Sequence, residues 1–189
     1  MTIRNTRAVS IEPVILTDES TVVAQYEPAE RDRTTYQSEA ALEASFIKQL
    51  QDQAYEYASS ITTEEDLTAN LRAQLEALNH YRFSDAEWKR FFEASIAASN
   101  DSVVDKTRRI QEDHVQILQR DNGESKNIRL IDKKRIHNNR LQVINQYAVD
   151  TGSHKNRYDV TILVNGLPLV HIELKRRGVP IREAFNQIN

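Results

Sequence analysis

The chain has 189 residues, of which 39% are hydrophobic and 28% charged, and a formal net charge of −3. These values are typical of one soluble globular domain or slightly more. The absence of cysteine excludes disulfides and thiolate metal sites. No apolar run approaches the ~18 residues of a membrane span, and the N-terminus lacks a signal-peptide core, so a cytoplasmic protein is the simplest interpretation.

The two halves of the chain carry opposite charge. Residues 1–100 hold 9 Lys and Arg against 17 Asp and Glu, a balance of −8, whereas residues 101–189 hold 16 against 11, a balance of +5. A basic half favours polyanionic partners such as nucleic acid. Many proteins that bind no nucleic acid are equally lopsided, so this feature alone leaves both interpretations open.

The first half predicts mainly helices. Residues 1–35 are weakly patterned and form either short strands (VILT and TVVAQY) or a partly extended N-terminal arm. Residues 36–58 predict the first helix, and a helical insertion follows at about 64–120. The second helix of the chain opens this insertion, the third begins at Ser84, which forms a capping box with Glu87, and the fourth covers much of 101–119 before the DNG at 121–123. The apolar stripes consist of Leu42, Phe46, Ile47, Leu50 and Ala54, then Leu67, Leu71, Leu75 and Leu78, which are core positions more readily than partner-binding ones.

The second half predicts strands and a last helix. NIRLI, LQVINQYAV, RYDVTILV and LPLVHIELK have the composition of strands, and Pro180 suits the first turn of a helix, PIREAFNQIN. Residues 127–189 thus hold the core strands and the start of a second core helix. The order of elements predicts a mixed α/β (α+β) domain. A helix of ten residues would be marginal without a partner, so we expect a longer protein.

Residues 156–178, NRYDVTILVNGLPLVHIELKRRG, predict a β-hairpin around an Asn-Gly turn. Asp159 lies on its first strand, and Glu173 and Lys175 share one face at the end of the second. Both strands are apolar, which suggests a central, doubly covered position where unpaired charges would be costly. Two carboxylates suit Mg²⁺, and the lysine could then orient a metal-bound water and offset phosphate charge. The alternative is that these charged side chains are simply exposed to water at the ends of the sheet.

The hairpin register tests this metal site. With a plain two-residue turn, Asp159 lies opposite Ile172, and Glu173 points to the other face of the sheet. A shared site requires one extra residue, in a three-residue loop or in a β-bulge near Pro168, which has no N–H to pair. We therefore predict the longer loop or the bulge.

The same residues resemble the PD-(D/E)xK nuclease motif, with Asp159, Glu173 and Lys175 in its three positions. The amino-acid sequence of residues 156–188 is even more similar to that of the R (restriction and translocation) subunit of type I restriction–modification enzymes. The likeness extends from about Tyr36 to the end of the chain through Ser38-x-x-x-Leu42-Glu43, VDKTRRI (104–110) and LIDKK (130–134).

The resemblance implies a restriction-endonuclease-like core, in which a mixed β-sheet is flanked by helices, with residues 36–189 as the endonuclease domain. The final core strand would be missing, so the C-terminal part of the core is truncated. A first-helix acid, matched by Glu43, would join the metal ligands Asp159 and Glu173, although Glu39 one turn earlier is its rival. Gln187 matches the glutamine of a supporting Gln-x-x-x-Tyr motif whose tyrosine position lies beyond residue 189.

The implied activity is Mg²⁺-dependent, non-sequence-specific cleavage of double-stranded DNA, as the nuclease of a type I site-specific deoxyribonuclease. The implied partners are the modification and specificity subunits, and ATP would be used only by motor domains outside this chain. No GxxxxGK[ST] phosphate loop is present, because GESKN at 123–127 does not fit. Alternatives are a catalytically silent docking or DNA-binding module and a stand-alone PD-(D/E)xK nuclease. We expect weak activity or none from these 189 residues alone.

Five basic residues are candidates for contact with DNA phosphates: Arg176 and Arg177 beside the proposed site, and Lys133, Lys134 and Arg135 in DKKRIHNNR. The second group is equally well interpreted as a solvated loop between strands. His171 shares the face of Glu173, where a hydrogen-bonded neighbour is the more frequent role than a catalytic one.

Overall fold

The computed structural model describes residues 11–16, 22–26, 38–150 and 155–175. The chain divides into two compact units, Met1–Gln37 and Ser38–Asn189. In the first unit, β1 (Ile11–Leu16) pairs antiparallel with β2 (Val22–Tyr26), and the register shifts between Pro13 and Ile15. Both segments that the sequence marked as possible strands are therefore strands.

The second unit begins with α1 (Glu39–Asp52), whose N-cap Ser38 accepts the N–H of Ala41. The prediction of a helix as far as residue 58 is wrong. Ala54 takes a left-handed φ of 68°, which an α-helix cannot accommodate. The chain then forms β3 (Glu56–Tyr57), and the apolar stripe of the helix stops at Leu50.

The insertion contains three helices, each opened by a capping box: α2 (Glu64–Asn79), α3 (Asp85–Phe91) and α4 (Val103–Gln111). A π-helical turn (Phe92–Ile96) follows α3. The start predicted at Ser84 is confirmed. The fourth predicted helix is correct only in its first half, because β4 (Val115–Gln119) pairs antiparallel with β5 (Ser125–Arg129).

The DNG segment is thus a hairpin turn between β4 and β5 rather than a helix end. Gly123 has a φ of 85°, which glycine adopts without strain. Leu118 and Ile128, one from each strand, are 1% and 0% exposed and belong to the core of the insertion. The four residues VQIL fit one turn of a helix as well as a short strand, so their pattern alone cannot distinguish the two.

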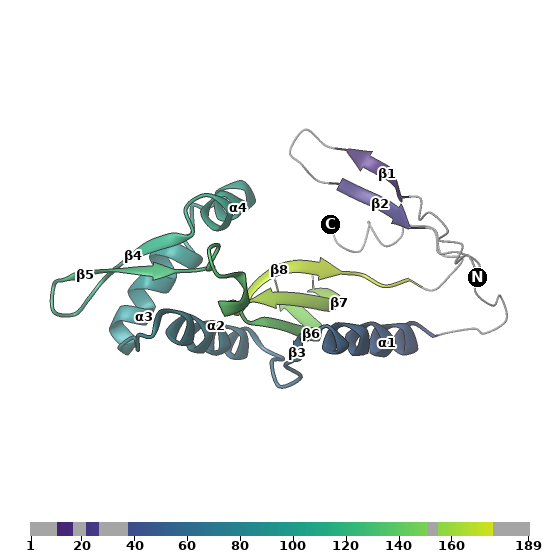
Figure 1. Ribbon diagram of the computed structural model, residues 1–189, viewed down its shortest axis with the longest axis horizontal. Helices are drawn as coiled ribbons and strands as arrows, with labels where there is room; N and C mark the ends of the chain where they lie inside the picture. The colour runs from purple at the N-terminus through teal and green to yellow at the C-terminus, as the bar shows by residue number, and fades with distance from the viewer. Residues whose placement is uncertain (1–10, 17–21, 27–37, 151–154, 176–189) are drawn as a thin grey trace, which may run out of the picture. The chain divides into compact units, whose positions relative to one another are not determined.

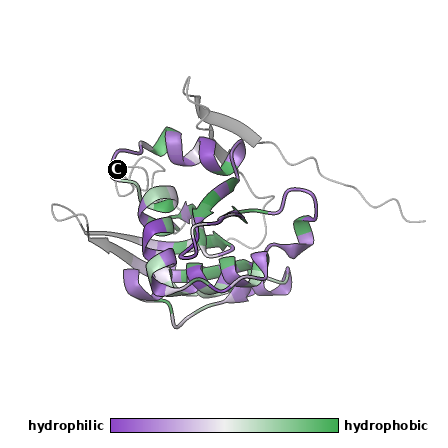
Figure 2. Ribbon diagram, turned by 90° about the vertical axis from the view of Figure 1, so that its left-hand side faces the viewer, coloured by the Kyte–Doolittle hydropathy of each residue, from purple (hydrophilic) through white to green (hydrophobic). Residues whose placement is uncertain are grey.

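One hydrophobic core joins the helices of the insertion to its hairpin. Leu71 and Leu75 of α2 pack with an aromatic cluster in which Phe83 and Phe91 stack with ring centroids 5.6 Å apart. The interpretation of α2 leucines as core is confirmed for these two, which are 4% and 0% exposed. In Figure 2 the helices carry both hydrophobic and hydrophilic residues along their length, as expected for helices with one buried face.

The central sheet has the order β3-β6-β7-β8, with β6 spanning Leu141–Asp150, β7 Lys155–Val164 and β8 Leu167–Ile172. β3 and β6 are parallel, and the other pairs are antiparallel, so the sheet is mixed, as predicted. In Figure 1 the sheet lies between α1 at one end and the insertion, with α3, α4 and the β4–β5 hairpin, at the other.

The strands differ in burial. β6 and β7 are central, and their Val143, Ile144, Val160 and Leu163 are all 0% exposed. The expectation of a doubly covered position is wrong for β8, which is the edge strand of the described sheet and exposes Pro168 to His171. No helix within the described ranges is long and apolar enough to cross a bilayer.

Candidate active site

The β7–β8 hairpin contains the extra residue that a shared site requires. Asn165 and Gly166 form the two-residue turn with φ values of 51° and 82°, as in a type I′ turn. Leu163 pairs with Pro168, but the register then shifts and Ile162 pairs with Val170, which leaves Leu169 as the inserted residue. The predicted bulge is confirmed beside the proline.

The shift decides which residues meet at the far end of the hairpin. Val160 pairs with Ile172 beyond the bulge, so Asp159 is aligned with Glu173 rather than with Ile172. A carboxylate oxygen of Asp159 accepts the backbone N–H of Leu174 at 2.7 Å, which joins the two strand ends directly. The bulge therefore places both acids on one face.

The turn itself is fixed by close packing. A Cβ on Gly166 would lie 2.6 Å from the Cα of Leu71, so only glycine permits this approach of the hairpin to α2. Asn165 is 1% exposed, and its backbone N–H and side-chain oxygen bond to Arg140 at 2.8 Å each. The hairpin is thus held at its turn, and its open end carries the acids.

Lys175 is paired with Glu173 at that open end. Its ammonium nitrogen lies 2.6 Å from a carboxylate oxygen of Glu173, and the two side chains are only 17% and 7% exposed. This hydrogen bond raises the pKa of Lys175, burial opposes the rise, and the charges of Glu173, Glu39 and Asp159 add to it. The structure therefore brings the three predicted catalytic residues together, with a protonated lysine among acids.

Both candidate acids of α1 face this region, in different ways. Glu39 is exposed and acts on Lys175 through its charge. Glu43 is half-buried, and its carboxylate accepts hydrogen bonds from the side-chain amides of Asn145, at 2.6 Å, and Gln146. Gln146 lies across from Asp159 in the β6–β7 register.

The donor set suits a hard cation, within limits. Over the described part of the chain, no group of three or more His, Asp or Glu side chains is arranged to hold an ion. Mg²⁺, however, commonly takes one or two carboxylates and keeps several waters. Asp159 and Glu173 already lie beside one cation, the ammonium of Lys175, so their position fits a positively charged group.

Comparisons with known proteins point to one family. Residues 36–189 match the family model of the type I restriction enzyme R protein N terminus. The chain is 46% identical over 178 residues to the type I restriction enzyme EcoprrI endonuclease subunit of Escherichia coli, covering 94% of this chain and 56% of that protein. The chain belongs to the type I restriction enzyme R protein family.

Two staphylococcal members extend the comparison. The SsaAORF53P endonuclease subunit of Staphylococcus saprophyticus is 40% identical over 158 residues, and the SauMSSORF170P endonuclease subunit of Staphylococcus aureus is 38% identical over the same length. Each match covers 81% of this chain and 16% of the relative. The chain thus spans about half the length of the E. coli relative and a smaller part of the others.

Sequence reasoning missed Asn145 and Gln146, the two amides that hold Glu43. The signal was present, since NQ interrupts the otherwise apolar strand LQVINQYAV, and buried polar side chains require partners. His171 behaves as expected of a structural neighbour. Its ring stacks on Tyr158 with centroids 4.0 Å apart, its Nδ1 lies 3.0 Å from the hydroxyl oxygen of Thr161, and burial lowers its pKa.

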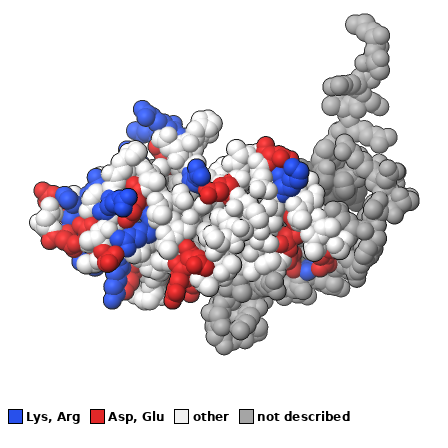
Figure 3. Space-filling model, turned by 90° about the horizontal axis from the view of Figure 1, so that it is seen from below, with Lys and Arg blue, Asp and Glu red and all other residues white. Residues whose placement is uncertain are grey.

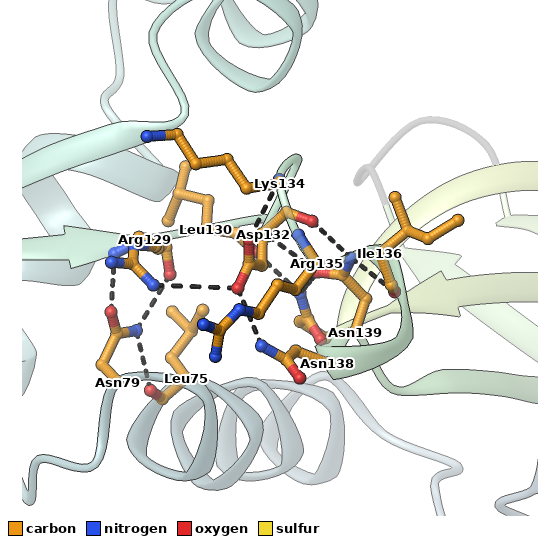
Figure 4. A network of polar contacts seen from close by, with 11 residues as sticks. Leu75, Asn79, Arg129, Leu130, Asp132, Lys134, Arg135, Ile136, Asn138 and Asn139 are labelled. Atoms are coloured by element: carbon orange, nitrogen blue, oxygen red, sulfur yellow. Dashed lines mark hydrogen bonds and ion pairs between the residues drawn. The ribbon is translucent and has the colours of Figure 1, made fainter.

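The basic loop of this R-family chain lies at the other end of β6. Lys133, Lys134 and Arg135 are exposed on the segment between β5 and β6. Their backbone is organised by Asp132, which accepts the N–H groups of Lys134 and Arg135 at 3.1 and 2.9 Å, as Figure 4 shows. From Leu141 to Gln146 the strand advances by roughly 16 Å, so this loop is separate from the acid cluster.

Surface charge gives no single basic patch on the face in Figure 3, where Lys and Arg are interspersed with Asp and Glu. Arg176, Arg177, Gln187 and the helix predicted from Pro180 lie outside the described residues.

Proposed function

We propose that residues 36–189 form the endonuclease region of a type I restriction enzyme R subunit, which cleaves DNA phosphodiesters in a Mg²⁺-dependent reaction. The observation that carries the proposal is the bulge at Leu169, because it aligns Asp159 with Glu173 and Lys175 at one end of the sheet. In the plain register, Asp159 would lie opposite Ile172, and Glu173 and Lys175 would point to the other face of the sheet.

In this mechanism Asp159 and Glu173 would hold a Mg²⁺ ion, which would supply Lewis-acid stabilisation of the phosphate and activate a water for attack. Lys175 exchanges its partner Glu173 for the attacking water and a phosphate oxygen, where its ammonium offsets developing negative charge. Its raised pKa keeps it cationic at neutral pH, as that task requires. Glu43, which Asn145 and Gln146 hold by both carboxylate oxygens, supports the metal directly or through a water.

DNA contacts in this proposal go to phosphates. Lys133, Lys134 and Arg135 are exposed on one loop, and Arg176 and Arg177 directly follow Lys175 in sequence. Phosphate contacts position DNA without reading bases, so cleavage is independent of local sequence. Target choice then belongs to a specificity subunit, methylation to a modification subunit, and ATP-driven translocation to motor domains outside this chain.

The test is a plasmid-cleavage assay with the R subunit that contains this region, its partner subunits, Mg²⁺ and ATP. Wild type, Lys175→Ala and the control Lys48→Ala are compared, with ATP hydrolysis followed in the same tubes. Lys48 is a suitable control because it pairs with Asp52 on an exposed face of α1, where its side chain is 75% exposed.

We expect Lys175→Ala to abolish cutting while ATP hydrolysis continues, and Lys48→Ala to cut like wild type. Undiminished cutting by Lys175→Ala would refute the nuclease assignment and would leave a silent docking module as the better account. Loss of both cutting and ATP hydrolysis would count against the proposal too, since it would place Lys175 in assembly rather than chemistry.

A further inference from the structure

Two neighbouring amides in β6 bind the same carboxylate. Asn145 donates to one oxygen of Glu43 at 2.6 Å, and Gln146 donates to the other oxygen. All three residues are half-buried, and Glu43 comes from α1, about a hundred residues earlier in the chain. The two amides therefore fix both oxygens of this acid against the sheet.

A regular strand could not make this arrangement, because consecutive side chains point to opposite faces. Gln146 escapes the alternation through a left-handed φ of 55°, one of the four described non-glycine residues with positive φ. Its ladder pair is interrupted, although Asn145–Val160 and Tyr147–Tyr158 pair normally on either side. The distortion thus lies at the level of Asp159, the residue across from Gln146.

The orientation of Asn145 is set from its other side. The hydroxyl of Tyr57, on the neighbouring strand β3, donates to the amide oxygen of Asn145 at 2.7 Å. This leaves only the NH₂ group to face Glu43, since the reversed amide would oppose an oxygen to a carboxylate. The chain Tyr57–Asn145–Glu43 is consequently a directed hydrogen-bond network.

We propose that Asn145 and Gln146 are positioning residues that hold Glu43 toward the metal side of the site, where its carboxylate accepts a hydrogen bond from a water on the ion. The inference rests on the proposed function. A tie that served stability alone would be met by Asn145, whose backbone is regular. The second tie requires the backbone of Gln146 to adopt an unfavourable left-handed φ of 55° beside Asp159, and such strain is typical of sites where geometry serves a reaction.

The substitution that separates positioning from stability is Gln146→Gly. Glycine adopts a positive φ without strain, so this variant keeps the backbone and loses only the amide. His80→Gly is the matched control, because His80 also has a left-handed φ, 49°, but caps the end of α2 away from the acids. Glu43→Gln and Asp159→Asn complete the set.

The measurement is Mn²⁺ binding, without nucleotide, to the R subunit that contains this region, followed by the loss of the free-ion EPR signal, together with thermal unfolding. We expect Gln146→Gly to bind Mn²⁺ roughly 10-fold more weakly, the scale of residues that orient metal ligands, with a melting temperature equal to or above wild type. Glu43→Gln should show the same loss, and the double variant no further loss. His80→Gly should bind like wild type.

The outcomes distinguish this inference from the proposed function. Wild-type affinity in Gln146→Gly overturns the positioning role, as does a lowered melting temperature that accounts for weaker binding. Absence of Mn²⁺ binding by the wild type, or unchanged binding in Asp159→Asn, overturns the metal site and with it the proposed function. Weak binding confined to Asp159→Asn, Glu43→Gln and Gln146→Gly supports both.

Discussion

Asp132, in the loop between β5 and β6, and Glu173, just past β8, are both acids whose side chains are 7% exposed. Asp132 is compensated mainly by neutral donors, the N–H groups of Lys134 and Arg135 and the amide of Asn138 at 2.9 Å (Figure 4), with Arg129 at 3.7 Å as a smaller, charged contribution. Glu173 is instead compensated by a neighbouring cation, Lys175. The loop donors cannot leave without unfolding the loop, whereas an ammonium on a flexible stem can be exchanged for another cation.

Glu87 in α3 repeats the first pattern. It is 5% exposed and accepts from the N–H groups of Ser84 and Asp121 and from the hydroxyl of Tyr81. Burial acts to raise the pKa of Glu87, but these donors outweigh it and lower the pKa. Acids that hold the insertion together are thus capped by fixed donors, and the acid at the open end of the hairpin is paired with a replaceable charge.

The largest effect expected from this comparison is on cleavage. Glu173→Gln should reduce DNA cutting by the assembled enzyme roughly 100- to 1000-fold, the scale on which one group that stabilises the transition state acts. The melting temperature should fall modestly, because Lys175 loses its charged partner Glu173 but still has the charges of Asp159 and Glu39 nearby. Single-turnover cleavage and thermal unfolding measure the two quantities. A large loss of stability with cutting retained would place Glu173 among the structural acids.

The turn of the β7–β8 hairpin packs against α2 of the insertion, so Gly166→Ala should destabilise the contact between hairpin and insertion. Alanine would be held at a φ of 82° with its Cβ 2.6 Å from the backbone of Leu71, and we expect a loss of roughly 2–5 kcal/mol in unfolding free energy. Gly123→Ala is the control, because its φ is 85° but nothing lies within 4 Å of the added Cβ. Urea unfolding should show the smaller loss for Gly123→Ala, and equal losses would contradict the close-packing argument.

Much of the hairpin could be predicted because its determinants are local. Asn-Gly specifies the turn, alternation specifies the strands, and the need for Asp159 and Glu173 to share a face requires the extra residue that Leu169 supplies. The end of α1 and the distortion at Gln146 could not be predicted in this way. Each depends on the φ of a single non-glycine residue, Ala54 or Gln146, which tertiary contacts impose against local preference.

The prediction that β8 is buried on both faces was wrong for a related reason. An apolar strand such as LPLVHI is typical of a central position, but the composition of a strand does not reveal its neighbours. The structural role of Asp132 was not predicted either, because it lies in a run of charged residues that is typical of a solvated loop. Its donors, Lys134, Arg135 and Asn138, are recognised only once the loop is folded.

Asp132→Asn tests whether Asp132 stabilises the fold rather than taking part in cleavage. The substitution replaces one acceptor oxygen with an NH₂ group that faces other donors, which leaves buried N–H groups unpaired, so the melting temperature should fall by roughly 5 °C. Cutting per folded molecule should fall far less than in Glu173→Gln, because the loop lies at the far end of β6 from Asp159 and only its phosphate contacts would be disturbed. Cleavage is measured well below the melting temperature and normalised to folded protein. Lost cutting in a folded variant would join this loop to the chemistry.

The smallest expected effects distinguish the two centres by pH. Backbone hydrogen bonding from Arg135, the largest cause, lowers the pKa of Asp132 below its ordinary 3.8, so its contribution to stability is present above that value and lost as the pH falls through the lowered pKa. Lys175 has the opposite sign, since its hydrogen bond to Glu173 raises its pKa above 10.5. Its contribution is complete below 10.5 and lost as the pH rises through the raised pKa.

The dependence of the melting temperature on pH should therefore become flatter only on the alkaline side in Lys175→Met and only on the acid side in Asp132→Asn. A Lys175→Met profile parallel to wild type at high pH would mean that the Glu173–Lys175 pair contributes nothing to folding, and that the lysine is held there for cleavage alone.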